Sequence, residues 1–229
     1  MKIRILQLLD GAREAKGLTV IIDVFRAFST ACYVFKNGAS RIIPVGDIKL
    51  AYQLKAEHPS FPLIGERHGE RPPGFDYGNS PAEIEHVDFA GKTIIHTTSA
   101  GTQGIANANK AQEIITGSFC NAGAVIRYIR SQQPGQVSLV CMGTGGKVPT
   151  DEDTLCAQYI KDALEEKSTH FTNIRKHLRT YESGQRFFDP AITWAHERDF
   201  DLCLTLDNFD AVLQVQRRNN SYPVLHLVK

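Results

Sequence analysis

The chain of 229 residues is 42% hydrophobic and 22% charged, values typical of a globular protein with a full core. Its formal net charge is only +1 and its basic residues are scattered, which argues against a nucleic-acid partner. The longest apolar stretch, residues 18–25, is interrupted by Asp23 and is too short to span a membrane. Because the N-terminus also lacks the apolar segment of a signal peptide, we expect a cytoplasmic protein with no membrane partner.

The cysteines and the chain length further restrict the possible architectures. The five cysteines are irregularly spaced and form no C-x-x-C pair, so neither a disulfide framework nor a zinc site is indicated. We expect buried thiols in a reducing compartment. The length suits one compact α/β catalytic unit over residues 1–229. Residues 132–135 are either a sub-domain seam or, as we favour, a tight loop between a helix and a strand.

Short β-branched runs alternate with amphipathic stretches, a pattern typical of α/β folds. Strands are predicted at residues 2–8, 18–23, 41–45, 62–65, 92–96, 113–116 and 136–142. Helices are predicted at residues 26–37, 47–57, 80–86, 102–108, 122–131 and 150–166. Several helices follow in residues 170–206, and two late strands at 211–215 and 224–228. The sequence therefore predicts a three-layer α/β/α fold with a largely parallel or mixed sheet and extra helices in the C-terminal third.

Ligands of open α/β sheets bind beyond the carboxyl ends of the strands, so the residues that follow each strand are the candidates for a site. The strand at 18–23 ends in Asp23, and Arg26, Ser29 and Thr30 follow at the start of a helix. A carboxylate at a strand end can hold a hard cation or act as a nucleophile, and a guanidinium beside it can hold a phosphate. The alternative is that Asp23 only caps the helix and pairs with Arg26.

The strand at 62–65 ends in Glu66 and Arg67, and a long loop rich in glycine and proline follows. Loops of this length inside compact domains are usually functional. Asn79 and Ser80 close the loop, and Ser80 with Glu83 three residues later also predicts an ordinary helix cap. We therefore regard Glu66 and Arg67 as site residues and Asn79 and Ser80 as groups that orient substrate or water.

The strand at 92–96 is followed by Thr97, Thr98, Gly101 and Thr102. Hydroxyls and a glycine in front of a helix form a natural cradle for an oxyanion. The same residues would also serve as a simple hydroxyl-rich cap, and that alternative stays open.

The strand at 136–142 is followed by Gly143 and Thr144, and a helix begins with Glu152 and Asp153 in its first turn. The glycine lets backbone N–H groups approach an anion, and the acids can bind a metal or complement the helix dipole. Each of these four loops is a weak signal alone. Together they indicate one site for an anionic ester and a hard cation.

These loops carry a family resemblance. The chain resembles the 2-phosphosulfolactate phosphatase family in order from the first strand to about residue 165, and again over 199–212. The matching segments are Ile22–Ala27 with Ser29-Thr30, Gly65–Arg67, Gly74–Pro81, Thr97-Thr98, Gly101-Thr102, Gly117–Ala122, Cys141–Thr144 and Glu152–Ala157. The resemblance implies Mg²⁺-dependent hydrolysis of 2-phosphosulfolactate to sulfolactate and phosphate, a step in coenzyme M biosynthesis. Ala100, Phe25 and Phe28 depart from the family pattern, so a close analogue of that substrate stays open.

A candidate site follows from these residues and the resemblance. The candidate catalytic residues are Asp23, Arg26, Glu66, Arg67 and Asp153. The candidate ligands of Mg²⁺ are Asp23, Glu66, Glu152 and Asp153. The candidate substrate-binding residues are Ser29, Thr30, Asn79, Ser80, Thr97, Thr98, Gly101, Thr102, Gly143 and Thr144. In this hypothesis Arg26 neutralises the phosphoryl oxygens, while Arg67, with Arg71 as a weaker candidate, holds the carboxylate or sulfonate. The nucleophile is either water or a carboxylate such as Asp23.

Two other functions have to be weighed. Residues 67–73 fit the R-H-G-x-R-x-P pattern of histidine acid phosphatases, which would make His68 the nucleophile of a metal-independent reaction. That family also needs a downstream His-Asp or similar acid pair; no His-Asp dipeptide exists here, and His196-Glu197 is the closest. A phosphate-binding module without turnover is the other alternative, although an anion site alone has no need of convergent acids. Residues 170–198, with Trp194 and His196, carry no recognised motif and are assigned to packing or to a homodimer surface.

Overall fold

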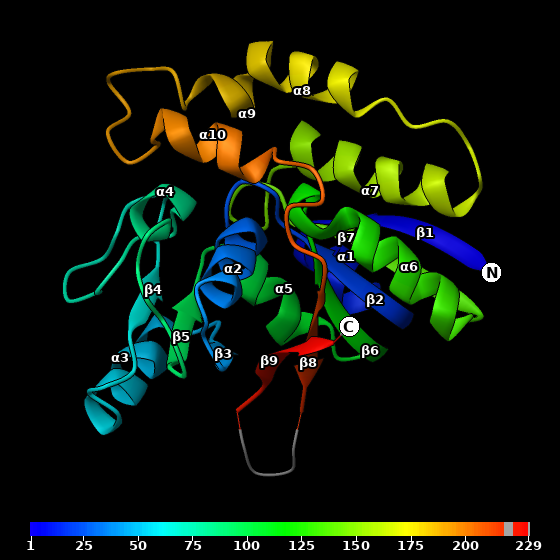
Figure 1. Ribbon diagram of the computed structural model, residues 1–229. Helices are drawn as coiled ribbons and strands as arrows, with labels where there is room; N and C mark the ends of the chain where they lie inside the picture. The colour runs from blue at the N-terminus through cyan, green and yellow to red at the C-terminus, as the bar shows by residue number, and fades with distance from the viewer. Residues whose placement is uncertain (218–221, 229) are drawn as a thin grey trace.

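The computed structural model describes residues 1–217 and 222–228. All strands join one nine-stranded sheet in the order β1-β7-β2-β6-β8-β9-β3-β5-β4 (Figure 1). The strands are β1 (Lys2–Gln7), β2 (Gly17–Ile22), β3 (Arg41–Pro44), β4 (Leu63–Gly65), β5 (Thr93–Thr97), β6 (Ala111–Gly117), β7 (Gln136–Cys141), β8 (Val212–Gln216) and β9 (Val224–Val228). The sheet is mostly parallel with an antiparallel β8–β9 hairpin, so the predicted α/β fold with a mixed sheet is confirmed.

Helices alternate with the strands as predicted, and further helices follow in the C-terminal third. They are α1 (Leu8–Glu14), α2 (Ala27–Lys36), α3 (Ile48–Glu57), α4 (Pro81–Ile84), α5 (Gly101–Asn107), the 3₁₀ turn η1 (Phe119–Asn121), α6 (Ala122–Gln132), α7 (Asp151–Leu164), α8 (Phe171–Thr180), α9 (Glu182–Gln185) and α10 (Glu197–Cys203). The sequence did not predict α1. This helix contains Gly11, a poor helix former, which packs so closely on Leu6 that a Cβ would lie 2.9 Å from the Leu6 Cβ.

The sheet consists of two parallel blocks. One block contains β1, β7, β2 and β6, the other contains β3, β5 and β4, and the β8–β9 hairpin joins them. Three successive antiparallel pairings separate β6 from β3, so the blocks run in opposite senses across the hairpin. Five strand-to-strand steps separate β2 from β5, and the usual twist per step accumulates to roughly 100° over that span. This twist turns the second block relative to the first, which allows strand ends from both blocks to meet.

Three hydrophobic clusters cover the two faces of the sheet. One hydrophobic cluster takes a residue from every strand and packs them against α1, α2 and α5: Leu6, Ile21, Ile42, Ile64, Ile94, Ile114, Val140, Leu213 and Leu225. A second cluster covers the other face of the first block, where Val20 and Ile22 meet α6, α7, α8 and α10. A third packs α3 on the second block. Alternate residues of β2 thus belong to opposite cores, as the two-residue period of a strand requires.

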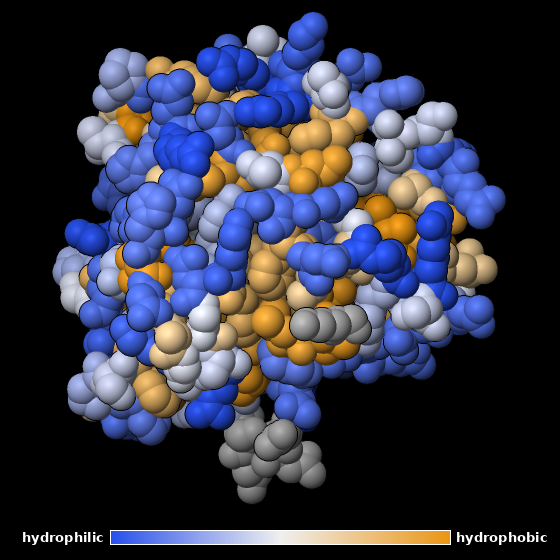
Figure 2. Space-filling model, viewed as in Figure 1, coloured by the Kyte–Doolittle hydropathy of each residue, from blue (hydrophilic) through white to orange (hydrophobic). Residues whose placement is uncertain are grey.

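The C-terminal helices α8, α9 and α10 gather at one end of the molecule, at the top of Figure 1, with the β8–β9 hairpin at the other end. Viewed from the same side, the surface is largely hydrophilic, with apolar groups showing between the polar ones (Figure 2). All five cysteines are buried and free, as the sequence predicted. Within the described residues, each helix is too short or too polar to cross a bilayer.

Candidate functional site

A cavity of about 1100 Å³ lies where the ends of β2, β4, β5 and β7 meet the C-terminal helices. We call the part formed by the loops after these strands the strand-end wall. Its lining residues are Asp23, Phe25, Arg26, Glu66, His68, Gly69, Ser99, Ala100, Gly143, Thr144, Gly145, Val148, Pro149, Thr150, Glu152 and Asp153. The opposite part, formed by residues 179–194, we call the helical wall. The volume is at the upper end of the range for small-molecule sites in proteins.

Asp23 lies directly after β2 and is 6% exposed. Its Oδ1 accepts a hydrogen bond of 3.2 Å from the Ala27 N–H. Burial raises the pKa of Asp23 to about 7; the Ala27 N–H opposes the rise, and the charges of Glu66 and Glu152 reinforce it. On the far side, a Cβ at Gly101 would lie 2.9 Å from Oδ2, so only glycine leaves room there. Asp23 is therefore an acid whose charge is poorly compensated by the protein itself.

Asp153 fastens two strand-end loops together. Its Oδ1 accepts from the Val24 N–H and its Oδ2 from the Gly143 N–H, both at 2.8 Å. Burial raises the pKa of Asp153 well above its usual range, and the charges of Glu152 and Asp23 add to the effect. The carboxylate thus fixes the spacing of the β2 and β7 loops while it contributes charge to the cavity.

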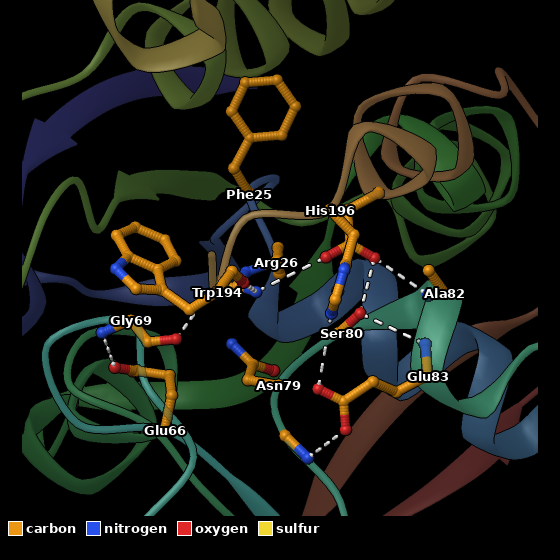
Figure 3. A network of polar contacts seen from close by, with 12 residues as sticks. Phe25, Arg26, Glu66, Gly69, Asn79, Ser80, Ala82, Glu83, Trp194 and His196 are labelled. Atoms are coloured by element: carbon orange, nitrogen blue, oxygen red, sulfur yellow. Dashed lines mark hydrogen bonds and ion pairs between the residues drawn. The ribbon is translucent and has the colours of Figure 1, made fainter. Parts of the chain in front are cut away.

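Glu66 has the same role at the ends of β4 and β5. Its Oε1 accepts from the Ser99 N–H at 2.6 Å, and its Oε2 accepts from the Ser99 hydroxyl at 3.0 Å and the Gly69 N–H at 2.8 Å. Figure 3 shows the Glu66 side chain beneath Gly69, whose N–H it accepts. The two fastened acids therefore come from the two blocks of the sheet, one from each.

Glu152 is the acid that the fold leaves without a hydrogen bond. It lies in the first turn of α7, is 3% exposed, and its Oε2 has no partner. Thr150, Ser183 and Arg186 also line the cavity and each has a buried polar atom without a partner. Four of the nine such atoms found in the described residues therefore lie around this one cavity. Buried polar atoms are normally satisfied, so the lining of this cavity is unusually rich in polar groups that the fold leaves unpaired.

Arg26 joins the two walls. Its Nη1 donates to the Trp194 carbonyl oxygen at 2.8 Å and lies 3.4 Å from Asp199 Oδ2, and its Nη2 donates to the Gly69 carbonyl oxygen at 2.9 Å (Figure 3). The guanidinium also lies 5.1 Å from the centre of the Trp194 ring. Arg26 lines the cavity, but most of its bonding capacity holds the helical wall against the β4 loop.

Asp199, on α10, is fully buried behind Arg26. Its Oδ1 accepts from the Ser80 hydroxyl at 2.8 Å and from the Ala82 N–H at 2.9 Å. Ser80 in turn accepts from the Glu83 N–H at 3.2 Å, which confirms the predicted helix cap. Ser80 is thus engaged in holding α4 to α10, away from the cavity lining.

Arg67 points away from the cavity. Its Nη1 donates to the Glu66 carbonyl oxygen at 2.6 Å, and its Nη2 donates to the Thr97 hydroxyl at 2.7 Å. The side chain lines a separate pocket beside Asp47 and Gln103. Successive side chains of an extended chain point to opposite sides, so an inward Glu66 requires an outward Arg67.

Several predicted hydroxyl groups bond within their own loops. The Ser29 hydroxyl donates to the Val24 carbonyl oxygen at 2.8 Å. Thr98 and Thr102 exchange N–H to hydroxyl bonds of 2.9 and 3.1 Å, which is the capping arrangement left open above. Thr30 is fully buried inside α2. These residues shape the loops that carry Asp23 and Ser99.

The predicted set thus divides into two groups. Of the predicted residues, the cavity lining includes Asp23, Arg26, Glu66, Asn79, Gly143, Thr144, Glu152 and Asp153. The others lie outside it: Ser29, Thr30, Arg67, Ser80, Thr97, Thr98, Gly101 and Thr102. Across residues 1–217 and 222–228, no three acidic, histidine or cysteine side chains are close enough to form a ready-made metal centre.

Sequence reasoning missed most of the helical wall and two polar groups opposite it. Arg186 and Trp194 lie in a stretch without a recognised motif, and no sequence signal marks them. Ser99 and Thr150, by contrast, follow predicted strands and could have been found by the rule that identified Asp23.

Comparison with known proteins gives a consistent result. A family model described as 2-phosphosulpholactate phosphatase matches residues 4–218. A protein of Thermotoga petrophila named "Probable 2-phosphosulfolactate phosphatase" is 34% identical over 201 residues, covering 84% of this chain and 86% of that protein. Proteins of the same name from Thermoplasma acidophilum (33% identity; 85% and 84% covered) and Clostridium perfringens (30% identity; 90% and 89% covered) are also similar.

Proposed function

The chain belongs to the 2-phosphosulfolactate phosphatase family, a family of phosphoric monoester hydrolases, and on that premise we propose that it hydrolyses 2-phosphosulfolactate with the help of Mg²⁺. In the reaction water adds its oxygen to phosphorus, the ester P–O bond breaks, and the leaving alkoxide takes up a proton, giving sulfolactate and phosphate. A phosphate-binding module without turnover does not fit membership of a hydrolase family.

The observation that carries the proposal is the concentration of uncompensated acids at the strand-end wall. Burial and the neighbouring acids raise the pKa of Asp23 to about 7, and Glu152 Oε2 is buried without a partner. Acids so placed repel one another unless a cation lies between them. A binding site for a phosphate alone would have no reason to gather them, because they also repel the phosphate.

The donor set fits Mg²⁺, which prefers carboxylate oxygens and retains several waters. Asp23 and Glu152 have the most free lone pairs and would be the main ligands. Glu66 and Asp153, whose oxygens already accept N–H groups, would accept hydrogen bonds from the waters that the ion retains. When bound, the ion would neutralise charge on the phosphoryl oxygens. An ion that keeps waters does not require three protein side chains in direct contact, which is consistent with the dispersed arrangement found here.

The protein's own side chains and loops shape the site around the proposed ion. Glu66 and Asp153 hold the loops of the two blocks at fixed spacing. Gly145 has a φ of +61°, a backbone conformation that other residues adopt only with strain, and no atom lies within 4 Å of the position of a Cβ. Glycine therefore allows the turn in the loop after β7. Arg26 adds a positive charge at the edge of the cavity while it holds Trp194 in place. The five buried free thiols support the expected reducing, cytoplasmic environment.

The test is phosphate release from 2-phosphosulfolactate by the purified protein, with Mg²⁺ and with EDTA. We expect turnover that EDTA abolishes and added Mg²⁺ restores. Full activity in EDTA would reject the metal assignment, and no release under either condition would reject the substrate. A panel of phosphorylated hydroxy acids run in parallel identifies a closer substrate if the first is turned over slowly.

A further inference from the structure

The helical wall presents a cation and a hydroxyl that the fold itself does not satisfy. Arg186 Nε and Ser183 Oγ are buried and have no hydrogen-bond partner, and both residues line the cavity. Arg186 is otherwise held by a bond of 3.2 Å from its Nη2 to the Phe25 carbonyl oxygen. Unsatisfied donors of this kind are costly unless a ligand accepts from them.

The charges around Arg186 point to an anionic ligand. Burial lowers its pKa, Glu152 and Asp23 on the opposite wall favour its charged form, and Arg26 opposes it. Both acids influence Arg186 through their charge, and among the described residues Arg186 forms no ion pair. A buried cation without a paired anion is unfavourable, so a negative group that enters the cavity is strongly attracted to it.

Aromatic rings fix the guanidinium in place. Its centre lies 5.1 Å from the Phe187 ring, 5.7 Å from the Phe25 ring and 5.8 Å from the Trp194 ring. Rings at these distances attract the cation through their faces and limit its rotamers. Arg186 is therefore positioned before the ligand arrives, which lowers the cost of binding.

We propose that Arg186 and Ser183 form a subsite for the sulfonate of the substrate, which does not react. This inference rests on the proposed function. In 2-phosphosulfolactate the phosphate and the carboxylate are attached to the same carbon, and the sulfonate extends from the next one. With the phosphoryl group at the acids of the strand-end wall, the sulfonate is the anionic group that extends furthest toward the opposite wall. Its three oxygens can accept from both the guanidinium and the hydroxyl.

The experiment compares two esters, 2-phosphosulfolactate and phospholactate, which lacks the sulfonate. Arg186→Gln should lower kcat/KM for 2-phosphosulfolactate by about 10- to 100-fold, the effect of losing a charged hydrogen bond, and that for phospholactate by less than about threefold. Ser183→Ala, a small change that preserves the fold, should act in the same selective direction by about threefold to tenfold. Arg175→Gln, which removes an exposed α8 arginine paired with Asp201, is the matched control and should change neither value.

Equal losses on both esters, or no loss on either, would overturn the subsite. Sulfolactate binding measured by calorimetry separates this failure from failure of the proposed function, because it requires no turnover. If the wild-type protein hydrolyses neither ester, the proposed function is wrong. In that case about tenfold weaker sulfolactate binding by Arg186→Gln would still support the subsite, and equal or absent binding in both proteins would reject it.

Discussion

The two walls of the cavity differ in charge, in origin and in how they are held. The strand-end wall carries the acids Asp23, Glu66, Glu152 and Asp153, and backbone N–H groups fasten Glu66 and Asp153. The helical wall carries Arg179 and Arg186 balanced by Glu182 and Asp189, together with aromatic rings, and its link to the other wall is the Arg26 network. In our proposals the strand-end wall binds the cation and the phosphate, and the helical wall binds the sulfonate. The division suggests that reaction and substrate choice are handled by separate parts of the chain.

Replacing Asp23 tests the acidic wall and should give the largest effect. Asp23→Asn should lower kcat by about 10³-fold, because it removes a main ligand of the Mg²⁺ that would neutralise charge on the phosphoryl oxygens. The same change should stabilise the metal-free protein. Folding raises the pKa of Asp23 from 3.8 to about 7, so ionisation at higher pH costs stability, on the order of 4 kcal/mol once the pH exceeds 7.

The pH dependence of the free energy of unfolding tests whether Asp23→Asn stabilises the metal-free protein. Well below pH 3.8 Asp23 is protonated in both the folded and the unfolded protein, so wild type and Asp23→Asn should be equally stable there. The advantage of the variant should grow as the pH rises to 7 and then level off. Urea unfolding in EDTA across this range measures it. A variant that is less stable than wild type at pH 8 would show that the acids are compensated within the protein.

The Arg26 network that connects the two walls includes a buried ion pair between Arg26 and Asp199. Asp199→Asn leaves the Arg26 charge without its partner and should lower the free energy of unfolding by about 3–5 kcal/mol. The control is Asp201→Asn on the same helix, where the ion pair to Arg175 is exposed and worth at most about 1 kcal/mol. Denaturant unfolding of both variants gives the comparison. Equal losses would mean that the Arg26 network does not hold the walls together.

Gly69 is where the two walls touch. A Cβ at this position would lie 2.8 Å from the Trp194 ring, so Gly69→Ala should push the indole away and raise KM severalfold. Gly91→Ala is the control, because Gly91 also has a positive φ but nothing within 4 Å of its Cβ position. Trp194 is the sole tryptophan of the chain, so its fluorescence reports the displacement directly. A shifted emission in Gly91→Ala, or none in Gly69→Ala, would contradict the contact.

His68 should show the smallest effect. It lines the cavity but is exposed, and its ring has no role in holding either wall. His68→Gln should therefore change kcat by less than about threefold, since surface substitutions of this kind are nearly neutral. A phosphohistidine mechanism requires complete loss instead, and phosphate release assays distinguish the two. A complete loss would move the chemistry from the acids to the histidine.

The strand-end wall could be predicted from the sequence because a general rule locates it. Residues that follow parallel strands line the ligand cleft, and this identified Asp23, Glu66 and Gly143 without knowledge of the strand order. The rule could not say which of two adjacent residues points inward, so Arg67 was included along with Glu66. Nor could it distinguish hydroxyls that cap a loop, such as Thr98, from hydroxyls that face a ligand.

The helical wall could not be predicted because it depends on tertiary packing. Residues 170–198 were assigned to packing or a dimer surface, and Trp194 and Arg186 instead line the cavity. Their position follows from how α8 and α10 pack on the second core, through Leu178 and Phe200. No local pattern encodes that packing. The curvature of the sheet is similarly invisible, because it arises from the β8–β9 hairpin inserted between the two blocks.

The central claim is that the acids of the strand-end wall bind one divalent cation. Calorimetric titration of Mg²⁺ into the wild-type protein and into Glu152→Gln tests it without any substrate. The control is Asp151→Asn, the neighbouring acid in the same helical turn, which contacts His177 outside the cavity. We predict one Mg²⁺ per chain, bound at least about tenfold more weakly by Glu152→Gln, the loss of one charged ligand, and unchanged in Asp151→Asn. Equal binding by all three proteins, or none by wild type, would contradict the account.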